Sequence, residues 1–154
     1  MSEKEQENSV AEEKVQAFQK HLTENEISGF DFRDLDNDMH AYVFRSNLPI
    51  QGQNLPFMVL LDDSVYTIIQ VQTASNIVTA EKKQEICCYL NDLNERYRML
   101  KYHVDSTGSL FLTCCIPAGT PDFEPALIIA ILNQIQGHLN DVYPEIMGKI
   151  WNRG

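Results

Sequence analysis

Four cysteines, arranged as two adjacent pairs, are candidates for metal or redox chemistry. The pairs are Cys87-Cys88 and Cys114-Cys115. A structural zinc site places its ligands two to four residues apart, so that two side chains can reach one ion. Neighbouring side chains on a helix or strand diverge instead, so we expect four reduced thiols, partly packed in the core. A redox or metal role for these thiols is the alternative.

An acidic segment suggests calcium binding. Asp34, Asp36 and Asp38 have the alternate spacing with which a calcium loop begins. The sixth position would be Met39, where the turn requires glycine, and the twelfth would be Arg45, where the ion requires a bidentate glutamate. We therefore interpret this segment as an acidic, solvated loop.

The sequence lacks several common motifs of catalytic and nucleotide-binding sites. No pair among its four histidines has the i, i+4 spacing of a zinc-binding helix. The sequence also lacks a Gly-x-Ser-x-Gly elbow, a phosphate-binding glycine loop and a dinucleotide fingerprint. His103 lies near Asp105 and could act as a general base, but a partly exposed strand histidine is the simpler interpretation. We therefore expect a protein that is not an enzyme and that binds no metal or cofactor. The alternative is an enzyme whose site joins His103, Asp105 and a cysteine.

Composition narrows the class of partner. The 154 residues include 12 basic and 22 acidic side chains, a formal net charge of −10, and 44% of them are hydrophobic. This length supports one hydrophobic core. The acidic balance argues against nucleic acid and anionic membranes, and the apolar run 126–132 is far shorter than the ~20 residues that cross a bilayer. The N-terminus is polar where a signal peptide would be apolar, so we expect a cytoplasmic protein that binds other proteins.

Hydrophobic periodicity predicts an α+β fold in which helices pack against an antiparallel sheet, in the order α-βββ-α-ββ-α. Residues 1–9 are expected to form a flexible acidic tail and 10–151 a single domain. The predicted helices cover 9–24, 79–97 with Thr79 as N-cap, and a long segment from 122 or 123 that Pro144 ends or kinks. The predicted strands cover 39–46, 57–61, 65–72, 99–104 and 109–116, with 25–39 as a loop or weak edge strand.

The helices carry more apolar residues than one core face needs, which suggests a surface for a protein partner. The first turns of the third helix are apolar nearly all round, and Trp151 follows near its end. Ordinary core packing is the alternative for each of these residues. The candidate partner-binding residues are Val15, Phe18, Leu22, Phe44, Phe57, Val59, Leu127, Ile131 and Trp151.

One stretch of the sequence resembles a known family. Tyr89-Leu90-Asn91-Asp92-Leu93-Asn94 is followed by an arginine-containing turn, a strand, Asp105-Ser106-Thr107-Gly108 and a second strand. A long helix then ends in Tyr143-Pro144. This pattern resembles the YbjN family, whose fold is similar to that of type III secretion chaperones. The similarity in element order covers residues 10–147 and is sharpest over 79–116.

The resemblance implies a bacterial helix–sheet sandwich, often a homodimer, that binds proteins and has no enzymatic activity. It implies a chaperone or adaptor that holds an extended or C-terminal peptide segment of a client and aids its assembly or delivery. Strand addition at a sheet edge and apolar anchors in pockets would supply the binding. No motif specific to secretion is visible, so the client could belong to another assembly. A regulatory module that works by dimerisation, without a peptide groove, is the alternative.

Overall fold

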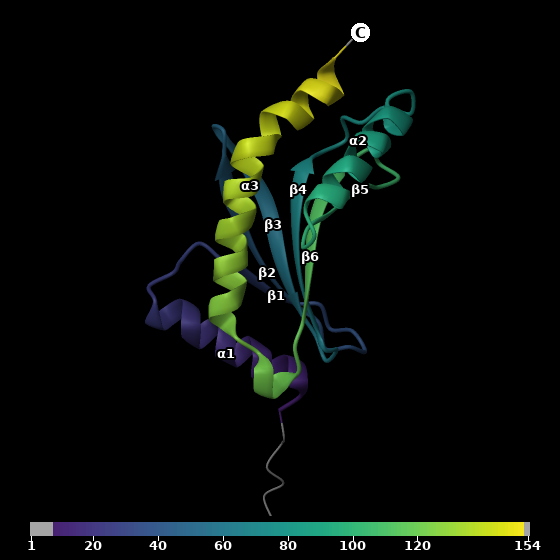
Figure 1. Cartoon of the computed structure of the whole chain (residues 1–154). Helices are drawn as coiled ribbons and strands as arrows, with labels where there is room; N and C mark the ends of the chain where they lie inside the picture. The colour runs from purple at the N-terminus through teal and green to yellow at the C-terminus, as the bar shows by residue number, and fades with distance from the viewer. Residues whose placement is uncertain (1–7, 153–154) are drawn as a thin grey trace, which may run out of the picture.

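The computed structural model describes residues 8–152, over which a six-stranded antiparallel sheet packs against three α-helices (Figure 1). The order α-ββββ-α-ββ-α confirms the predicted α+β layout and adds one edge strand. The strands lie in the spatial order β1-β2-β3-β4-β6-β5. The predicted tail over 1–9 falls mostly outside the described residues. The elements are α1 (Val10–Glu24), β1 (Asp31–Asp34), β2 (Tyr42–Ile50), β3 (Gln53–Leu61), β4 (Tyr66–Ala74), α2 (Lys83–Arg96), β5 (Lys101–Val104), β6 (Leu110–Pro117), the short 3₁₀ helix η1 (Thr120–Asp122) and α3 (Pro125–Trp151).

The first helix begins with a capping box. The Ser9 side chain accepts the backbone N–H of Glu12, and the Glu12 carboxylate accepts the N–H of Ser9. This start agrees with the predicted helix over 9–24. Further along α1, the ring centroid of Phe18 lies 4.8 Å from that of Phe44 and 5.8 Å from that of Phe30. These aromatic contacts fix α1 on the sheet.

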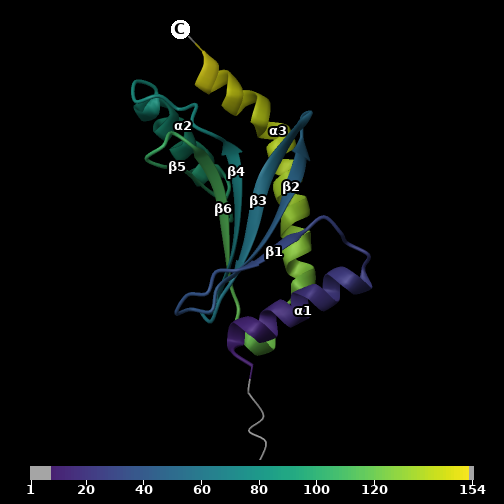
Figure 2. The same ribbon diagram turned by 180° about the vertical axis from the view of Figure 1, so that it is seen from behind.

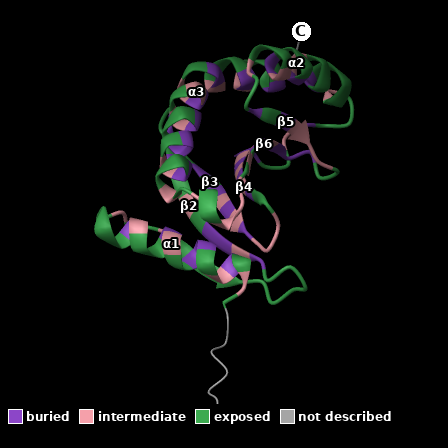
Figure 3. Cartoon of the chain, turned by 60° about the horizontal axis from the view of Figure 1, so that its bottom comes forward, coloured by how far each residue is buried: buried purple, intermediate pink, exposed green. Residues whose placement is uncertain are grey.

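Both long helices cover the same face of the sheet. In Figure 3, α1 and α3 each carry buried residues on the side turned toward the strands. Along β3, Leu55, Phe57, Val59 and Leu61 are buried beneath them, while the residues between are more exposed. Figure 2 shows the sheet from the opposite side, where no helix lies over β2, β3, β4 and β6. The sheet therefore has one helix-covered face and one open face.

The third helix begins at Pro125, two or three residues after the predicted start at 122 or 123. Proline is tolerated at this first position because its missing N–H needs no partner there. Pro144 does not end the helix, which continues to Trp151 and changes direction in its yellow C-terminal part (Figure 1). Ile146 and Ile150 beyond the proline are buried. No helix over residues 8–152 is both long and apolar enough to span a membrane.

Two predicted boundaries are wrong for local reasons. The segment from Gly52 to Pro56 was expected to interrupt the strands, but Gln51 and Gly52 alone form the turn, with positive φ values of 48° and 77°. Strands β2 and β3 therefore continue up to this two-residue turn, at Ile50 and Gln53. The second helix starts at Lys83, because Thr79 instead begins a turn in which its Oγ1 accepts the N–H of Lys82 at 3.3 Å.

The outer edge of β5 is closed by a side chain. The Asn94 amide of α2 accepts the backbone N–H of Tyr102 at 2.7 Å and donates to the Tyr102 carbonyl at 3.2 Å. Asn94 thus imitates a further strand at this edge and satisfies two backbone groups. Asn94, the last residue of the family-like motif, therefore caps a strand edge.

Replacing Asn94 with alanine is expected to lower the free energy of unfolding by about 2 kcal/mol, because both Tyr102 backbone groups lose their partner. Urea unfolding followed by circular dichroism measures this loss. Asn91→Ala, at an exposed position one turn earlier on the same helix, is the matched control and should change stability by less than about 0.5 kcal/mol. Equal losses in both variants would contradict the edge-capping role.

Candidate functional site

Most of the predicted partner-binding residues lie in the core. The two helices and the covered sheet face bury one another, so these side chains are unavailable to a partner in the folded chain. The apolar residues in excess of one helix stripe are thus core residues, packed between the helices and the sheet. The seven buried residues are Val15, Phe18, Leu22, Phe44, Phe57, Val59 and Ile131.

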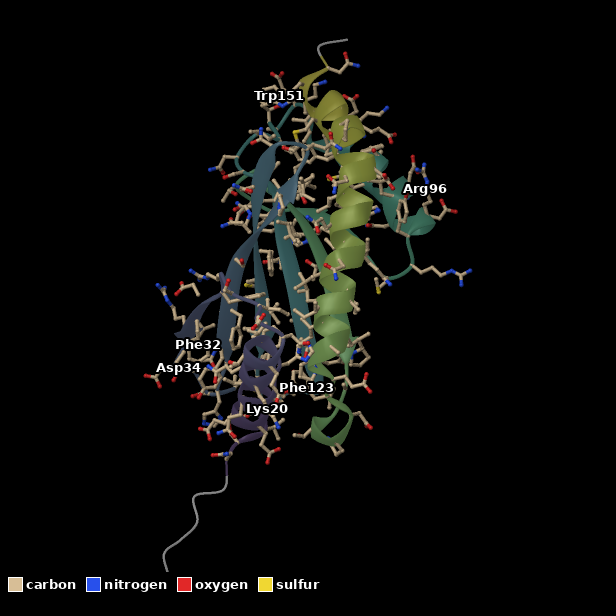
Figure 4. All side chains as sticks on the ribbon, turned by 90° about the vertical axis from the view of Figure 1, so that its left-hand side faces the viewer. Lys20, Phe32, Asp34, Arg96, Phe123 and Trp151 are labelled. Carbon is tan, nitrogen blue, oxygen red and sulfur yellow. The ribbon has the colours of Figure 1, made fainter. Side chains whose placement is uncertain are left out.

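Two of the predicted residues are exposed, at opposite ends of α3. Leu127 is 42% exposed in the first turn and Trp151 is 64% exposed in the last. Figure 4 shows Trp151 at the far end of the molecule from Lys20 of α1 and Phe32 of β1. Only at Trp151 does a large cavity adjoin the exposed side chain, as described below.

The residues considered for chemistry do not assemble into a site. Within residues 8–152, no three His, Cys, Asp or Glu side chains are placed to hold a metal ion. All four cysteines are free; Cys114 is buried, which raises its pKa, and the other three are exposed. The Asp105 carboxylate accepts from Thr107 and Ser109 within its turn, and these bonds lower its pKa. His103 instead stacks on Phe111, with ring centroids 5.3 Å apart.

The most connected titratable cluster joins the start of α1 to the β3–β4 turn. Protonated at Nδ1, His40 donates to Asp63 Oδ2 at 2.5 Å, and Ala11 N–H donates to Asp63 Oδ1 at 3.0 Å. These bonds raise the pKa of His40 and lower the pKa of Asp63. Beneath them the buried Lys14 ammonium donates to the carbonyls of Asp62 and Ser64 at 3.1 and 2.6 Å. The cluster fastens α1 to the sheet.

This pairing predicts a pH dependence of stability. Because the pKa of His40 is raised, the stability that its protonated form contributes is complete below its ordinary pKa of 6.5. It is lost as pH rises through the higher pKa of the folded state. The contribution of Asp63, whose pKa is lowered, is lost only as pH falls below 3.8. Urea unfolding of the wild type should therefore show a decline above pH 6.5 that His40→Gln lacks. His21→Gln is the control, since no carboxylate of the described residues lies within ion-pair distance of His21.

A second polar pair is structural. The Tyr102 hydroxyl donates to His138 Nε2 at 2.6 Å and thereby ties β5 to α3. Burial raises the pKa of Tyr102 and lowers that of His138, so the phenol remains protonated and the imidazole neutral. The pair acts as an ordinary buried hydrogen bond.

The open face of the sheet carries two different rows of side chains. The apolar row, at the end of the sheet near α1, contains Val43, Leu60, Ile68 and Cys115. The second row is mostly polar and crosses all six strands. Its members, from β1 to β5, are Asp31, Arg45, Met58, Gln70, Thr113 and Lys101.

A cavity of about 480 Å³ lies over the polar row. We call it the sheet-face groove. Met58 and Phe111 give it an apolar floor between the amide side chains of Asn47, Gln70 and Gln72. Its remaining lining residues are Gly29, Asp31, Arg45, Ser46, Pro56 and Phe57. The lining therefore mixes apolar contact area with side-chain amides and one residue of each charge, Asp31 and Arg45.

A second cavity, of about 380 Å³, continues from the first around the end of the sheet. The two cavities share Pro56 and Gln72. The second lies between β3 and β4, and Tyr143, Met147 and Trp151 of α3 line its other side. We call it the β3–β4 slot. None of its lining residues is charged; the others are Gln53, Leu55, Thr73, Ala74, Ser75 and Ile77.

Of the residues that line the two cavities, sequence reasoning named Trp151 and Phe57 as contact residues. Most of the others are polar or half-buried, so they produce no apolar stripe. Strand alternation was the available signal: Phe44 next to Arg45 and Val71 next to Gln70 place polar side chains on the face opposite the core. Asp31 and Arg45 are the two charged residues in the lining of the sheet-face groove, so its charges balance.

Comparison with known proteins adds no further information about this site. No protein family model matches the sequence. No curated protein is significantly similar to it.

Proposed function

We propose that this protein is a non-enzymatic chaperone or adaptor that holds a peptide segment of a client protein on the open face of its sheet. The observation that supports the proposal is the continuity of the sheet-face groove with the β3–β4 slot through Pro56 and Gln72. Together they form one path from Asp31 of β1 to Trp151 of α3. An elongated path of this kind suits a chain segment better than a compact metabolite.

The chemistry of the lining also suits a peptide. Side-chain amides both donate and accept, so Asn47, Gln70 and Gln72 match the alternating N–H and C=O groups of an extended backbone. Met58 is flexible and polarisable, which lets one surface accommodate different side chains. The path contains no nucleophile–base pair and no metal-binding set among the described residues. Binding without chemistry is the activity that these contacts support.

A selection from a random twelve-residue peptide library tests the proposal. We expect enrichment of specific sequences on the wild type, and Met58→Lys should weaken the selected peptides at least tenfold because it places a charge on the groove floor. Leu60→Lys is the matched control. It is the next residue on the same face of β3, it is also half-buried, and it lies outside the groove. Fluorescence anisotropy measures the affinities.

Two results would overturn the proposal: a selection that enriches no sequence, or selected peptides that bind Met58→Lys and Leu60→Lys equally well. Thermal melts of both variants show whether each remains folded at the temperature of the binding assay. If Met58→Lys unfolds, it is replaced by Gln70→Lys, which changes the groove from β4.

The apolar row on the same face favours a second candidate function, a regulatory module that works as a homodimer. Leu60, Ile68 and Cys115 lie side by side there, and Tyr66 beside them is 49% exposed. A second copy of the chain would cover this row. Sedimentation equilibrium at micromolar concentration tests it: a dimer of wild type that Leu60→Lys converts to monomer supports this function, and a wild-type monomer contradicts it.

A further inference from the structure

The pairing between β3 and β4 stops before either strand ends. Their ladder runs from Leu61↔Thr67 to Phe57↔Val71 and goes no further. Continued in the same register it would join Leu55 to Thr73, but these two residues instead line the β3–β4 slot. Figure 1 shows the two strands diverging toward the C-terminal part of α3.

This divergence leaves two free strand edges inside the sheet. Over the described residues, Gln53–Pro56 pairs with β2 alone, and Gln72–Ala74 pairs with β6 alone. Backbone N–H and C=O groups are strong hydrogen-bonding groups that a folded chain normally satisfies. The β3 edge is the poorer template of the two, because Pro56 has no N–H. The better free edge is therefore that of β4.

Thr73 supplies an independent indication that something pairs at this edge. It sits at an irregularity in the β4–β6 ladder and is only 1% exposed. Its hydroxyl is buried without a hydrogen-bond partner among the described residues, and the residue lines the slot. A buried, unsatisfied hydroxyl is unfavourable, so a ligand that offers it a backbone group would bind favourably there.

We propose that the β3–β4 slot accepts an extended segment of the client as an added strand, paired with the free edge of β4 and covered by Trp151. The proposal rests on the peptide-holding function proposed above and names its binding mode. Pairing of this kind supplies affinity through backbone hydrogen bonds and specificity through alternate side chains. About four residues of the segment would pair, given a rise of about 3.3 Å per residue.

The slot also defines the chemistry of the segment. Side chains on one side of an added strand would meet Tyr143, Met147 and Trp151, whereas those on the other would meet the amide of Gln72 on the open face. The segment should therefore alternate apolar and polar residues. Its centre should be uncharged like the slot, and basic residues should flank it, because the net charge of −10 attracts positive charge from a distance.

The test uses a ten-residue synthetic peptide whose six central residues alternate threonine and valine, with two lysines at each end. Trp151 is the one tryptophan in the sequence and lines the slot, so its emission reports occupancy directly. We expect a saturable blue shift on titration. Two further peptides carry backbone N-methyl groups on alternate central residues, one on the valines and the other on the threonines. At least one should bind tenfold more weakly or worse, because it cannot donate to the β4 edge.

Protein variants separate strand pairing from general stickiness. Thr73→Val keeps the side-chain shape and removes the hydroxyl, and should weaken the peptide about threefold or more. Trp151→Ala should weaken it about tenfold, measured by anisotropy of a labelled peptide. Leu127→Ala, at the other exposed apolar residue of α3, is the matched control and should have no effect.

Strand addition in the slot is overturned if the peptide does not bind at millimolar concentration. It is also overturned if the peptide binds without changing Trp151 emission, or if neither N-methylated peptide is weakened. These failures differ from failure of the proposed function. Library peptides that depend on Met58 but not on Thr73 or Trp151 would retain the chaperone function and place the client on the sheet-face groove alone.

Discussion

Gly108→Ala is expected to lower the free energy of unfolding by about 3 kcal/mol, one of the two largest effects predicted for this chain. Gly108 has a φ of +79° in the β5–β6 turn, and an added Cβ would lie 2.4 Å from the backbone oxygen of Val78. That neighbour is backbone, so it cannot rotate away. The shift would also break the hydrogen bond from Val78 N–H to the Gly108 carbonyl, now 3.0 Å long.

Gly52→Ala is the matched control for this prediction. Gly52 has a similar φ of +77°, but nothing lies within 4 Å of the added Cβ. It should cost about 1 kcal/mol, the left-handed strain alone. Urea unfolding of both variants separates steric clash from backbone strain, and equal losses would show that the approach to Val78 does not matter.

The second large effect is expected for Lys14→Met, which should lower the free energy of unfolding by about 3 kcal/mol. Lys14 is fully buried, and its ammonium is the donor to the carbonyls of Asp62 and Ser64. Burial lowers the pKa of Lys14, while the nearby charges of Asp62 and Asp63 act in the opposite direction. Methionine fills the same space and leaves both carbonyls without this donor.

Lys20→Met on the same helix is the control. The Lys20 side chain is 74% exposed and is paired only loosely with Glu24 at 3.8 Å, so its loss should change stability by less than about 0.5 kcal/mol. Chemical denaturation with an unchanged m-value measures both variants. A Lys14→Met protein as stable as Lys20→Met would show that the buried ammonium does not hold α1 in place.

Local signals allowed most of the fold to be predicted. The helical spacing of Val15, Phe18 and Leu22 predicts α1, and apolar stripes of the same kind predict α2 and α3, because this periodicity is a local signal. The edge strand β1 was predicted only as an alternative to a loop. All four of its residues, Asp31–Asp34, are exposed, so no apolar alternation distinguishes them. Its existence depends on pairing with β2, which is a tertiary interaction.

The candidate site was harder to predict because it depends on where two neighbouring strands diverge. Buried and partner-facing apolar residues have the same periodicity, so Phe18 and Trp151 could not be told apart from the sequence. The β3–β4 slot exists because β3 follows β2 beyond Phe57 while β4 follows β6 beyond Val71. This divergence is a tertiary feature, which no local pattern records.

The closure of β5 by Asn94 has a consequence for stoichiometry. A sheet open at both edges can add copies of itself without limit, and a filament is the result. Here one edge is occupied by a side-chain amide, and the other is β1, a short strand of exposed and mostly charged residues. Further copies of the chain therefore cannot keep adding strands at either edge of the sheet. Any complex that forms through this sheet is expected to contain a small, fixed number of chains.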